Sequence, residues 1–353
     1  MTNYKFFNLD LHVSVIADVK NIFATLFPHI EIVDMSISGH TWVMGKTKAD
    51  VKIINDKTWR YIDRKLIDIF HNLYDDFLCQ FDGFIVTHTP VFALLYEKYG
   101  KPIILVNSCR YEQPFSWNRN NKMREFLEFK LQKMNHSGQL IVICNNKADL
   151  HYLKLGTGID GIHIPSLCLY TNTQYSGVKN EFIIKGPRII PLTANMVYLD
   201  NVLRQGYVWD QLYSYKGIIH LPYEISTMSI FEQYSANVPL FFPQKYFLKQ
   251  LISNNKLYLQ SRYYFHSTPN SPYPSKLEPA LGPEWLDFWI ENADYYDQDN
   301  MKYITYFDSF ADLQDKLRII DTADISHKIT EWNKIRKNNV YSKWRYIIDK
   351  LLK

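Results

Sequence analysis

The sequence predicts an α/β fold built on parallel sheets, and three observations lead to that prediction. In the first half of the chain, short apolar runs alternate with amphipathic segments of helical period, which is the pattern of βα units. A stretch rich in Thr, Asn, Ser and Gly, from 171 to 187, interrupts this pattern. Beyond it, another apolar run leads into a helix. With 353 residues, of which 46% are hydrophobic, the chain is long enough for two domains.

Each strand is predicted from a short apolar run, and each helix from apolar residues that recur every three or four positions. In the first half we expect strands at 6–9, 31–33, 83–86, 103–106 and 140–144, with helices at 13–26, 58–81, 91–99, 123–134 and 147–155. In the second half we expect strands at 217–221 and 240–242, a helix that begins near 227, helices at 283–292 and 309–317, and one or two helices over 330–353. The apolar face predicted for the helix at 58–81 consists of Ile62, Leu66, Ile69, Phe70 and Leu73.

The predicted sheet of the first half places several polar residues at one edge. In an open parallel sheet, ligands bind beyond the carboxyl ends of the strands. Asp10 and His12 follow the first strand, and Asn107 and Arg110 follow the strand at 103–106. These four are candidate site residues. A histidine at a strand end is also often a hydrogen-bonded structural residue, and Arg110 with Glu112 can form a surface ion pair of little consequence.

The segment with the most specific chemistry contains two glutamates, Glu224 and Glu232, with seven residues between them. The apolar strand before it ends near Pro222, and Thr227 or Ser229 is suited to cap the helix that follows. Glu224 then lies in the loop, and Glu232 lies about five residues into the helix, roughly 7–8 Å along its axis. One ligand can reach both carboxylates. A capping box, Ser229-x-x-Glu232, is the structural alternative.

A strand that leads into a helix N-terminus also creates a place for a phosphate group. Several backbone N–H groups point the same way there, and the positive end of the helix dipole lies behind them. Phosphate binds at such helix ends. The amides that we expect to take this role belong to Ser226, Thr227, Met228 and Ser229.

The whole phrase resembles the E-x7-E segment of retaining glycosyltransferases with the GT-B fold, whose usual form is E-G-F-G-L-P-x-x-E-A-x-A-x-G-x-P. Glu224, Glu232 and Pro239 fall in register with it, and Ser235 keeps a small residue where the second alanine belongs. The sequence departs from the pattern where residues 225–227 replace the first two glycines. Asn237 replaces the later glycine, and asparagine tolerates a left-handed backbone.

The resemblance implies a GT-B-like α/β fold with two Rossmann-like domains facing a cleft and a C-terminal helix that returns to the first domain. The domain boundaries that we expect on this basis are 1–175 for an acceptor-side domain, 182–325 for a nucleotide-sugar domain and 326–353 for the returning helix. It further implies that Glu224 faces the donor sugar, that Glu232 holds the ribose and that the amides between them face the diphosphate. Glu224, with Asp10 and His12 from the first domain, then makes up the catalytic set.

Members of this family also contribute a basic pair to the diphosphate. Lys185 and Arg188 are the pair that we select, and Arg204 and Lys216 are the other basic residues available in this domain. No metal is expected. The Asp297-Gln298-Asp299 sequence resembles a cation-binding D-x-D, but it lies in an acidic stretch that is typical of a solvated loop. The only small molecule implied is the nucleotide diphosphate sugar, as donor substrate and not as a cofactor.

The C-terminal segment carries Trp344, Ile347, Ile348 and Leu351 on one face and basic residues elsewhere. A basic amphipathic helix with tryptophan can lie on a membrane surface. Packing on the protein itself is the more usual role of such a terminal helix and is the one that we expect.

Composition excludes several other classes of function. A net charge of +4 is too small to indicate nucleic acid as a partner. Four cysteines without metal or disulfide spacing, and no apolar run of transmembrane length, predict a cytoplasmic protein. No Walker A, G-x-G-x-x-G or G-x-S-x-G motif is present. The resemblance to retaining GT-B glycosyltransferases implies a glycosyltransferase that acts on a carbohydrate or other hydroxyl acceptor. A non-catalytic nucleotide-sugar or glycan-binding module and a sugar-nucleotide epimerase are the alternatives. The oligomeric state is left open.

Overall fold

The computed structural model describes residues 3–45, 47–203, 206–260 and 273–352. They divide into two compact units. Unit 1 comprises residues 1–166, 272–278 and 341–353, and unit 2 comprises residues 167–271 and 279–340. The boundary at 166/167 lies nine residues before the end of the first domain expected from the sequence, and the second boundary falls inside the last helix. Both units hold a wholly parallel sheet, which confirms the predicted class of two Rossmann-like α/β domains.

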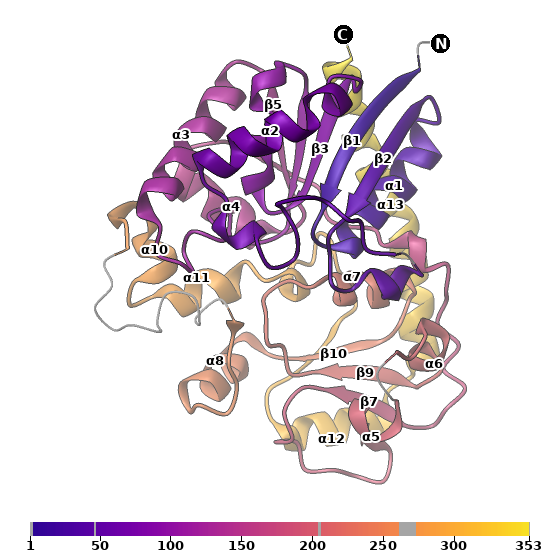
Figure 1. The fold of residues 1–353 in the computed structure, drawn as a ribbon. Helices are drawn as coiled ribbons and strands as arrows, with labels where there is room; N and C mark the ends of the chain where they lie inside the picture. The colour runs from indigo at the N-terminus through magenta and orange to yellow at the C-terminus, as the bar shows by residue number, and fades with distance from the viewer. Residues whose placement is uncertain (1–2, 46, 204–205, 261–272, 353) are drawn as a thin grey trace. The chain divides into compact units, whose positions relative to one another are not determined.

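The sheet of unit 1 has the strand order β2-β1-β3-β4-β5-β6, and every described pair of neighbours is parallel (Figure 1). Because both faces of such a sheet are covered, its central strands are apolar along their whole length. In β4 (Ile103–Asn107), for example, the first four residues are hydrophobic and buried. The strands are β1 (Tyr4–Asp10), β2 (Ile30–Ser36), β3 (Gly83–His88), β4 (Ile103–Asn107), β5 (Leu140–Cys144) and β6 (Ile162–His163).

The α-helices of unit 1 begin where polar side chains cap them. Asp63, Asn120 and Asn146 each accept a hydrogen bond from the backbone N–H three residues on, which satisfies a group that the helix itself leaves unpaired. The helices are α1 (Val13–Leu26), α2 (Arg64–Leu78), α3 (Asn121–His136) and α4 (Lys147–Thr157). Short 3₁₀ helices are η1 (Thr41–Met44), η2 (Trp59–Tyr61), η3 (Pro90–Leu95) and η4 (Glu97–Tyr99).

Two helix predictions for unit 1 need correction. The segment at 91–99 forms η3 and η4, separated by Tyr96, and is not one α-helix. The helix expected at 58–81 is shorter, because the Asp63 cap starts α2 at Arg64. The buried stripe of α2 is also narrower than its apolar pattern indicates, since Ile69 and Leu73 are 39% and 47% exposed.

The sheet of unit 2 has the strand order β11-β10-β9-β7-β8, again with every described pair of neighbours parallel. Its strands are β7 (Phe182–Lys185), β8 (Met196–Tyr198), β9 (Gly217–His220), β10 (Leu240–Pro243) and β11 (Thr305–Phe307). Its helical elements are η5 (Leu169–Thr171), α5 (Leu199–Val202), α6 (Trp209–Tyr213), α7 (Met228–Ser235), α8 (Lys245–Ser253), α11 (Trp285–Glu291), η7 (Asp294–Tyr296) and α12 (Phe310–Ile319). The turns η6 (Ser275–Leu277) and α10 (Glu278–Leu281) lie at the boundary of the two units.

Unit 2 also contains a backbone feature that the sequence indicated. Asn237, just beyond the end of α7, has a φ of 66°, which is the left-handed conformation that asparagine tolerates. Its N–H donates to the carbonyl of Tyr234 at 3.0 Å and so closes the last turn of the helix. The chain can then turn directly into β10.

The last 30 residues of secondary structure form one helix, α13 (Thr322–Leu351), where the sequence predicted one or two helices. Its final part belongs to unit 1. There the buried ring of Trp344 lies 5.4 Å from that of Phe23 in α1, at 77°, and Lys343 donates a hydrogen bond to the carbonyl of His163. The predicted return of the C-terminal helix to the first domain is confirmed by these contacts. Within the described residues, none of the helices has both the length and the apolar character needed to cross a bilayer.

The packing of Trp344 gives a stability prediction. We expect Trp344→Ala to lower the free energy of unfolding by about 3–5 kcal/mol, because a large buried ring is removed and a cavity remains. Tyr346→Ala is the matched control on the same helix, because Tyr346 is 66% exposed and should change stability by about 0.5 kcal/mol or less. Urea unfolding measures both. Equal effects would contradict this packing of the helix.

Candidate functional site

The strand order of unit 2 reverses direction between β7 and β9. From β7 the chain moves to β8 on one side, then returns to β9 on the other side. Connections that leave two neighbouring strands in opposite directions open a crevice beyond the carboxyl ends of those strands. A cavity of about 560 Å³ lies there. It is lined by Ile184, Lys185, Gly186, Pro187, Leu199, Asp200, Leu203, Tyr207, His220, Leu221, Pro222, Tyr223, Glu224, Thr227, Ser229 and Ile230.

The floor of this cavity depends on a close approach between the ends of β7 and β9. Gly186 follows β7 with a φ of 146°, a conformation that is essentially restricted to glycine. A Cβ at this position would lie 2.6 Å from the Cβ of Leu221 and 2.9 Å from its carbonyl oxygen. Leu221 in turn donates its N–H to the carbonyl of Lys185 at 2.9 Å. The sequence prediction did not include Gly186, because nothing local indicates this contact.

Lys185 brings a positive charge to the cavity. It is the last residue of β7 and is half-buried. Burial lowers the pKa of its ammonium group to about 8, and the negative charge of Glu232 acts in the opposite direction. Lys185 therefore remains mostly protonated at neutral pH while being poorly solvated. A cation in that condition gains more from binding an anion than a fully hydrated one does.

The N-terminus of α7 also opens into the cavity. Thr227 is the N-cap, with extended backbone, and its side chain makes no capping hydrogen bond within the described residues. Its hydroxyl lies 3.1 Å from that of Ser229 instead. The capping-box alternative is therefore wrong, since neither Ser229 nor Glu232 caps this helix. Thr227 and Ser229 line the cavity, whereas Ser226 and Met228 are not among its lining residues.

The two glutamates of the motif occupy different environments. Glu224 is buried and lines the cavity, and its Oε1 accepts a hydrogen bond from the N–H of Ile225 at 2.8 Å. Glu232 is half-buried and does not line it. One oxygen of Glu232 accepts a hydrogen bond from the hydroxyl of Tyr170, and the other accepts one from the indole of Trp209 at 3.2 Å. The structure therefore places only Glu224 on the cavity wall.

The remaining basic candidates lie elsewhere in unit 2. Arg188 is exposed and donates to Asp200 and to Asn201, at 2.8 Å each. It does not line the cavity, although Asp200 does. Lys216 precedes β9 at the amino end of that strand, which is the opposite edge of the sheet. Arg204 lies outside the residues that the structure describes.

Three stacked aromatic rings at the cavity, those of His220, Phe242 and Tyr295, were not predicted from the sequence. His220 ends β9, and its Nε2 is 2.7 Å from Oε1 of Gln233 in α7. Burial and the nearby Lys185 lower the pKa of His220 to about 3, so its ring is neutral. The ring stacks on Phe242 at 4.6 Å, and Phe242 stacks on Tyr295 at 4.5 Å. This layer fixes the end of β9 against the strand beside it.

In unit 1, Asp10 connects the carboxyl ends of neighbouring strands. Its carboxylate accepts hydrogen bonds from the hydroxyl of Ser36 at 2.7 Å, from Thr87 at 3.5 Å and from the N–H of His12 at 2.7 Å. Burial lowers the pKa of His12 to about 4, so its ring is neutral, and it lies 5.2 Å from the ring of His88. The structure thus brings Asp10 and His12 together, and their predicted catalytic role stays a prediction.

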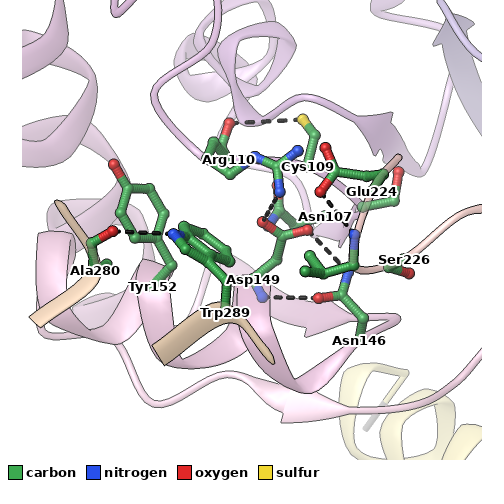
Figure 2. Close-up of polar contacts among 12 residues, drawn as sticks. Asn107, Cys109, Arg110, Asn146, Asp149, Tyr152, Glu224, Ser226, Ala280 and Trp289 are labelled. Atoms are coloured by element: carbon green, nitrogen blue, oxygen red, sulfur yellow. Dashed lines mark hydrogen bonds and ion pairs between the residues drawn. The ribbon is translucent and has the colours of Figure 1, made fainter. Parts of the chain in front are cut away.

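Arg110 and Glu112 do not form a surface ion pair. Both are buried, and Arg110 pairs with Asp149 at 3.7 Å (Figure 2). Asp149 also accepts a hydrogen bond from the side chain of Asn146 at 2.8 Å. Glu112 accepts one from Tyr152 at 3.0 Å, and burial raises its pKa to about 7. These residues form a buried polar network at the carboxyl end of the sheet of unit 1.

The described residues do not meet the requirements of a metal site. Across the described part of the chain, no group of three or more His, Cys, Asp or Glu residues is placed to hold a metal ion.

No protein-family model matches the sequence, and neither does any curated protein sequence. Solved structures show distant similarity. One is CalG4, the calicheamicin glycosyltransferase, at 9% identity and a TM-score of 0.41 over 100% of this chain and 99% of that chain. Another is the spinosyn rhamnosyltransferase SpnG complexed with thymidine diphosphate, at 10% identity and 0.37, over 82% and 95%. A third is S. aureus MnaA with UDP, at 10% and 0.37, over 83% and 91%. Similarities of this size assign the chain to no family.

The contact between Gly186 and Leu221 predicts intolerance of any side chain there. We expect Gly186→Ala to lower the free energy of unfolding by about 2–5 kcal/mol, from backbone strain and overpacking together. Gly138→Ala is the control, because Gly138 also has a positive φ, 78°, but open space around it. It should cost only about 1–2 kcal/mol. Similar losses in urea unfolding would show that the close approach does not matter.

The depressed pKa of Lys185 predicts a pH-dependent gain in stability when its charge is removed. Lys185→Met keeps the length of the side chain, and we expect it to raise Tm at pH 7. The folded-state pKa of Lys185, about 8, lies below the unfolded value. Burying the charged ammonium group therefore lowers the stability of the wild type by its full amount below pH 8. This loss of stability decreases as pH rises from 8 towards the unfolded pKa of about 10.4. Tm measured against pH should show the two proteins converging over that range. A Tm difference that is absent at pH 7 would contradict the assignment.

Proposed function

We propose that the protein is a glycosyltransferase that binds a nucleoside diphosphate sugar in the cavity of unit 2. It transfers the sugar to a carbohydrate or other hydroxyl acceptor with retention of anomeric configuration. The observation that carries the proposal is the combination, in one cavity at the strand-order reversal, of a poorly solvated cation, a carboxylate and the N-terminus of α7, where the Thr227 side chain makes no capping hydrogen bond to a described residue.

The diphosphate is the part of the ligand that the charges of the cavity favour. Sugar transfer requires that the departing diphosphate be stabilised as its negative charge develops. Lys185 supplies a full charge, and the amides at the start of α7 supply oriented N–H groups with the helix dipole behind them. In this proposal Thr227 and Ser229 lie beside the diphosphate. Ser226 and Met228 contribute through the backbone of the same turn.

The rest of the cavity suits a nucleoside and a sugar. Leu199, Leu203 and Tyr207 provide an apolar and aromatic wall for the base. Glu224 provides an acceptor for the hydroxyl groups of the donor sugar. A volume of about 560 Å³ falls within the roughly 300–1,000 Å³ typical of small-molecule sites.

The ribose role of Glu232 is the part of the proposal that requires rearrangement. Its two oxygens are held by Tyr170 and Trp209. A ribose hydroxyl can bind Glu232 only in exchange for, or in addition to, one of these hydrogen bonds, because an ionised carboxylate accepts several. Arg188 likewise has to leave Asp200 to reach a phosphate.

Unit 1 is assigned the acceptor in this proposal. The Asp10 carboxylate holds the backbone of His12, and the neutral His12 ring offers a hydrogen-bonding nitrogen to an acceptor hydroxyl. Retention without a protein nucleophile implies that the acceptor hydroxyl attacks from the side of the leaving diphosphate. The leaving group then takes up the proton of that hydroxyl as the new glycosidic bond forms.

The proposal predicts which ligands bind and how affinity depends on pH. Wild-type protein should bind at least one of UDP, GDP or dTDP, and affinity should fall as pH rises through about 8, where Lys185 loses its proton. Lys185→Met should weaken binding about 10- to 100-fold at pH 7 and remove that pH dependence. Isothermal titration at pH 6.5, 7.5 and 8.5 measures this. Failure to bind any nucleoside diphosphate would refute the proposed site.

Turnover then identifies the reaction. The enzyme should release nucleoside diphosphate from at least one member of a panel of nucleotide sugars supplied with hydroxyl acceptors. Glu224→Gln should reduce this turnover about 100-fold or more and leave the affinity for the nucleoside diphosphate unchanged. Binding without turnover would instead indicate a binding module. A changed sugar in the absence of acceptor would indicate an epimerase.

A further inference from the structure

The loop that connects β9 to α7 is held from behind by a distant turn. This loop, residues 221–227, carries Glu224 and ends at the N-cap of α7. The turn is η7, and its first residue, Asp294, makes two contacts with the loop. The N–H of Asp294 donates to the carbonyl of Ile225 at 3.2 Å, and its carboxylate accepts a hydrogen bond from the hydroxyl of Ser226. Asp294 is 1% exposed.

These two contacts determine how the loop peptide is oriented. A trans peptide is planar, and its C=O and N–H point in opposite directions. Because the carbonyl of Ile225 points to Asp294, the N–H of Ser226 in the same peptide points away from η7. The N–H of Ile225, one peptide earlier, donates to Glu224 at 2.8 Å. The orientation of this short segment therefore fixes both a backbone donor and the carboxylate on the cavity wall.

Asp294 itself is not a lining residue of the cavity. Its hydrogen bonds to Ile225 and Ser226 connect it to the loop that carries Glu224. The same turn is anchored at its other two residues. Tyr295 stacks on Phe242, and the hydroxyl of Tyr296 donates to the carbonyl of Pro243 at 2.6 Å. These contacts join η7 to β10, so the turn provides a fixed support for the loop.

We propose that Asp294 is a positioning residue: it holds residues 224–227 so that Glu224 and the first turn of α7 face the ligand in the cavity. The inference rests on the proposed function for the identity of that ligand. The contacts by which Asp294 holds the loop do not depend on it. Loss of the carboxylate leaves Ser226 without this partner, so that of the two contacts only the backbone hydrogen bond from Asp294 to Ile225 still holds the loop and its motion increases. Glu224 and Thr227, which line the cavity on either side of this segment, are then held less firmly although no residue of the wall has been changed.

The experiment compares variants that remove the same contact from either side. Asp294→Ala and Ser226→Ala should each weaken binding of the nucleoside diphosphate that the wild type binds, by about tenfold. The double variant should be no weaker than either single variant, since both remove one interaction. Asp294→Asn keeps an oxygen that can accept the hydrogen bond of Ser226, so its affinity for the nucleoside diphosphate should remain within about threefold of the wild type. If Asp294 served only to fill buried space, this rescue would not be expected.

Tyr296→Phe is the matched control. It removes a hydrogen bond from the same turn, but one made to β10 and not to the loop. It should lower stability without changing affinity. Hydrogen exchange supplies a readout that needs no ligand: amides at 224–230 should exchange faster in Asp294→Ala and Ser226→Ala than in Tyr296→Phe.

The outcomes separate this inference from the proposed function. If the wild type binds no nucleoside diphosphate but exchange at 224–230 rises only in Asp294→Ala and Ser226→Ala, the proposed function fails and the hold on the loop stands. If the wild type binds a nucleoside diphosphate, and both variants are folded, bind it as tightly as the wild type and show wild-type exchange at 224–230, the inference about Asp294 is overturned while the proposed function stands. Additive losses in the double variant, or equal loss in Tyr296→Phe, would overturn it as well.

Discussion

The reversal of strand order between β7 and β9 is the constraint from which the candidate site follows. If the strands of unit 2 were added in one direction only, the loops after β7 and β9 would pack side by side. The reversal separates them and leaves space at the carboxyl edge. Close contact is then possible only at the base of the cavity, where Gly186 meets Leu221. A glycine at that position brings the two strand ends together while the loops above them diverge.

The glutamates of the motif show how one local pattern can serve two structural purposes. Glu224 lies in the irregular loop, where the chain is free to place a side chain on the cavity wall. Glu232 lies inside α7, where it draws Tyr170 and Trp209 towards the helix. Its charge still reaches the cavity through space, since it acts on the pKa of Lys185. The second glutamate therefore contributes to the electrostatics of the site as well as to packing.

Periodicity in the sequence was enough to predict most of unit 1 and the βα unit that carries Glu224, because strands such as β4 and helices such as α3 are long enough to show a pattern. It could not predict β8 or β11, which have only three residues each. The site divides in the same way. Glu224 and the turn at Thr227 are local features, whereas the support from Asp294 is 68 residues away and the contact of Gly186 depends on Leu221. Such contacts leave no mark on local composition.

Lys185 also connects stability with the chemistry of the site. A lysine at the end of a buried strand is unfavourable for folding when its ammonium group is poorly solvated, and an apolar side chain would fit the strand pattern better. Structural ion pairs usually remove such a cost, but Glu232 is engaged by two other donors and influences Lys185 only at a distance. The positive charge of Lys185 is therefore only partly compensated within the folded protein. Unfavourable groups of this kind are concentrated at sites where a ligand completes the interaction. In this cavity the group that would complete it is an anion, and the first turn of α7 favours the same sign of charge.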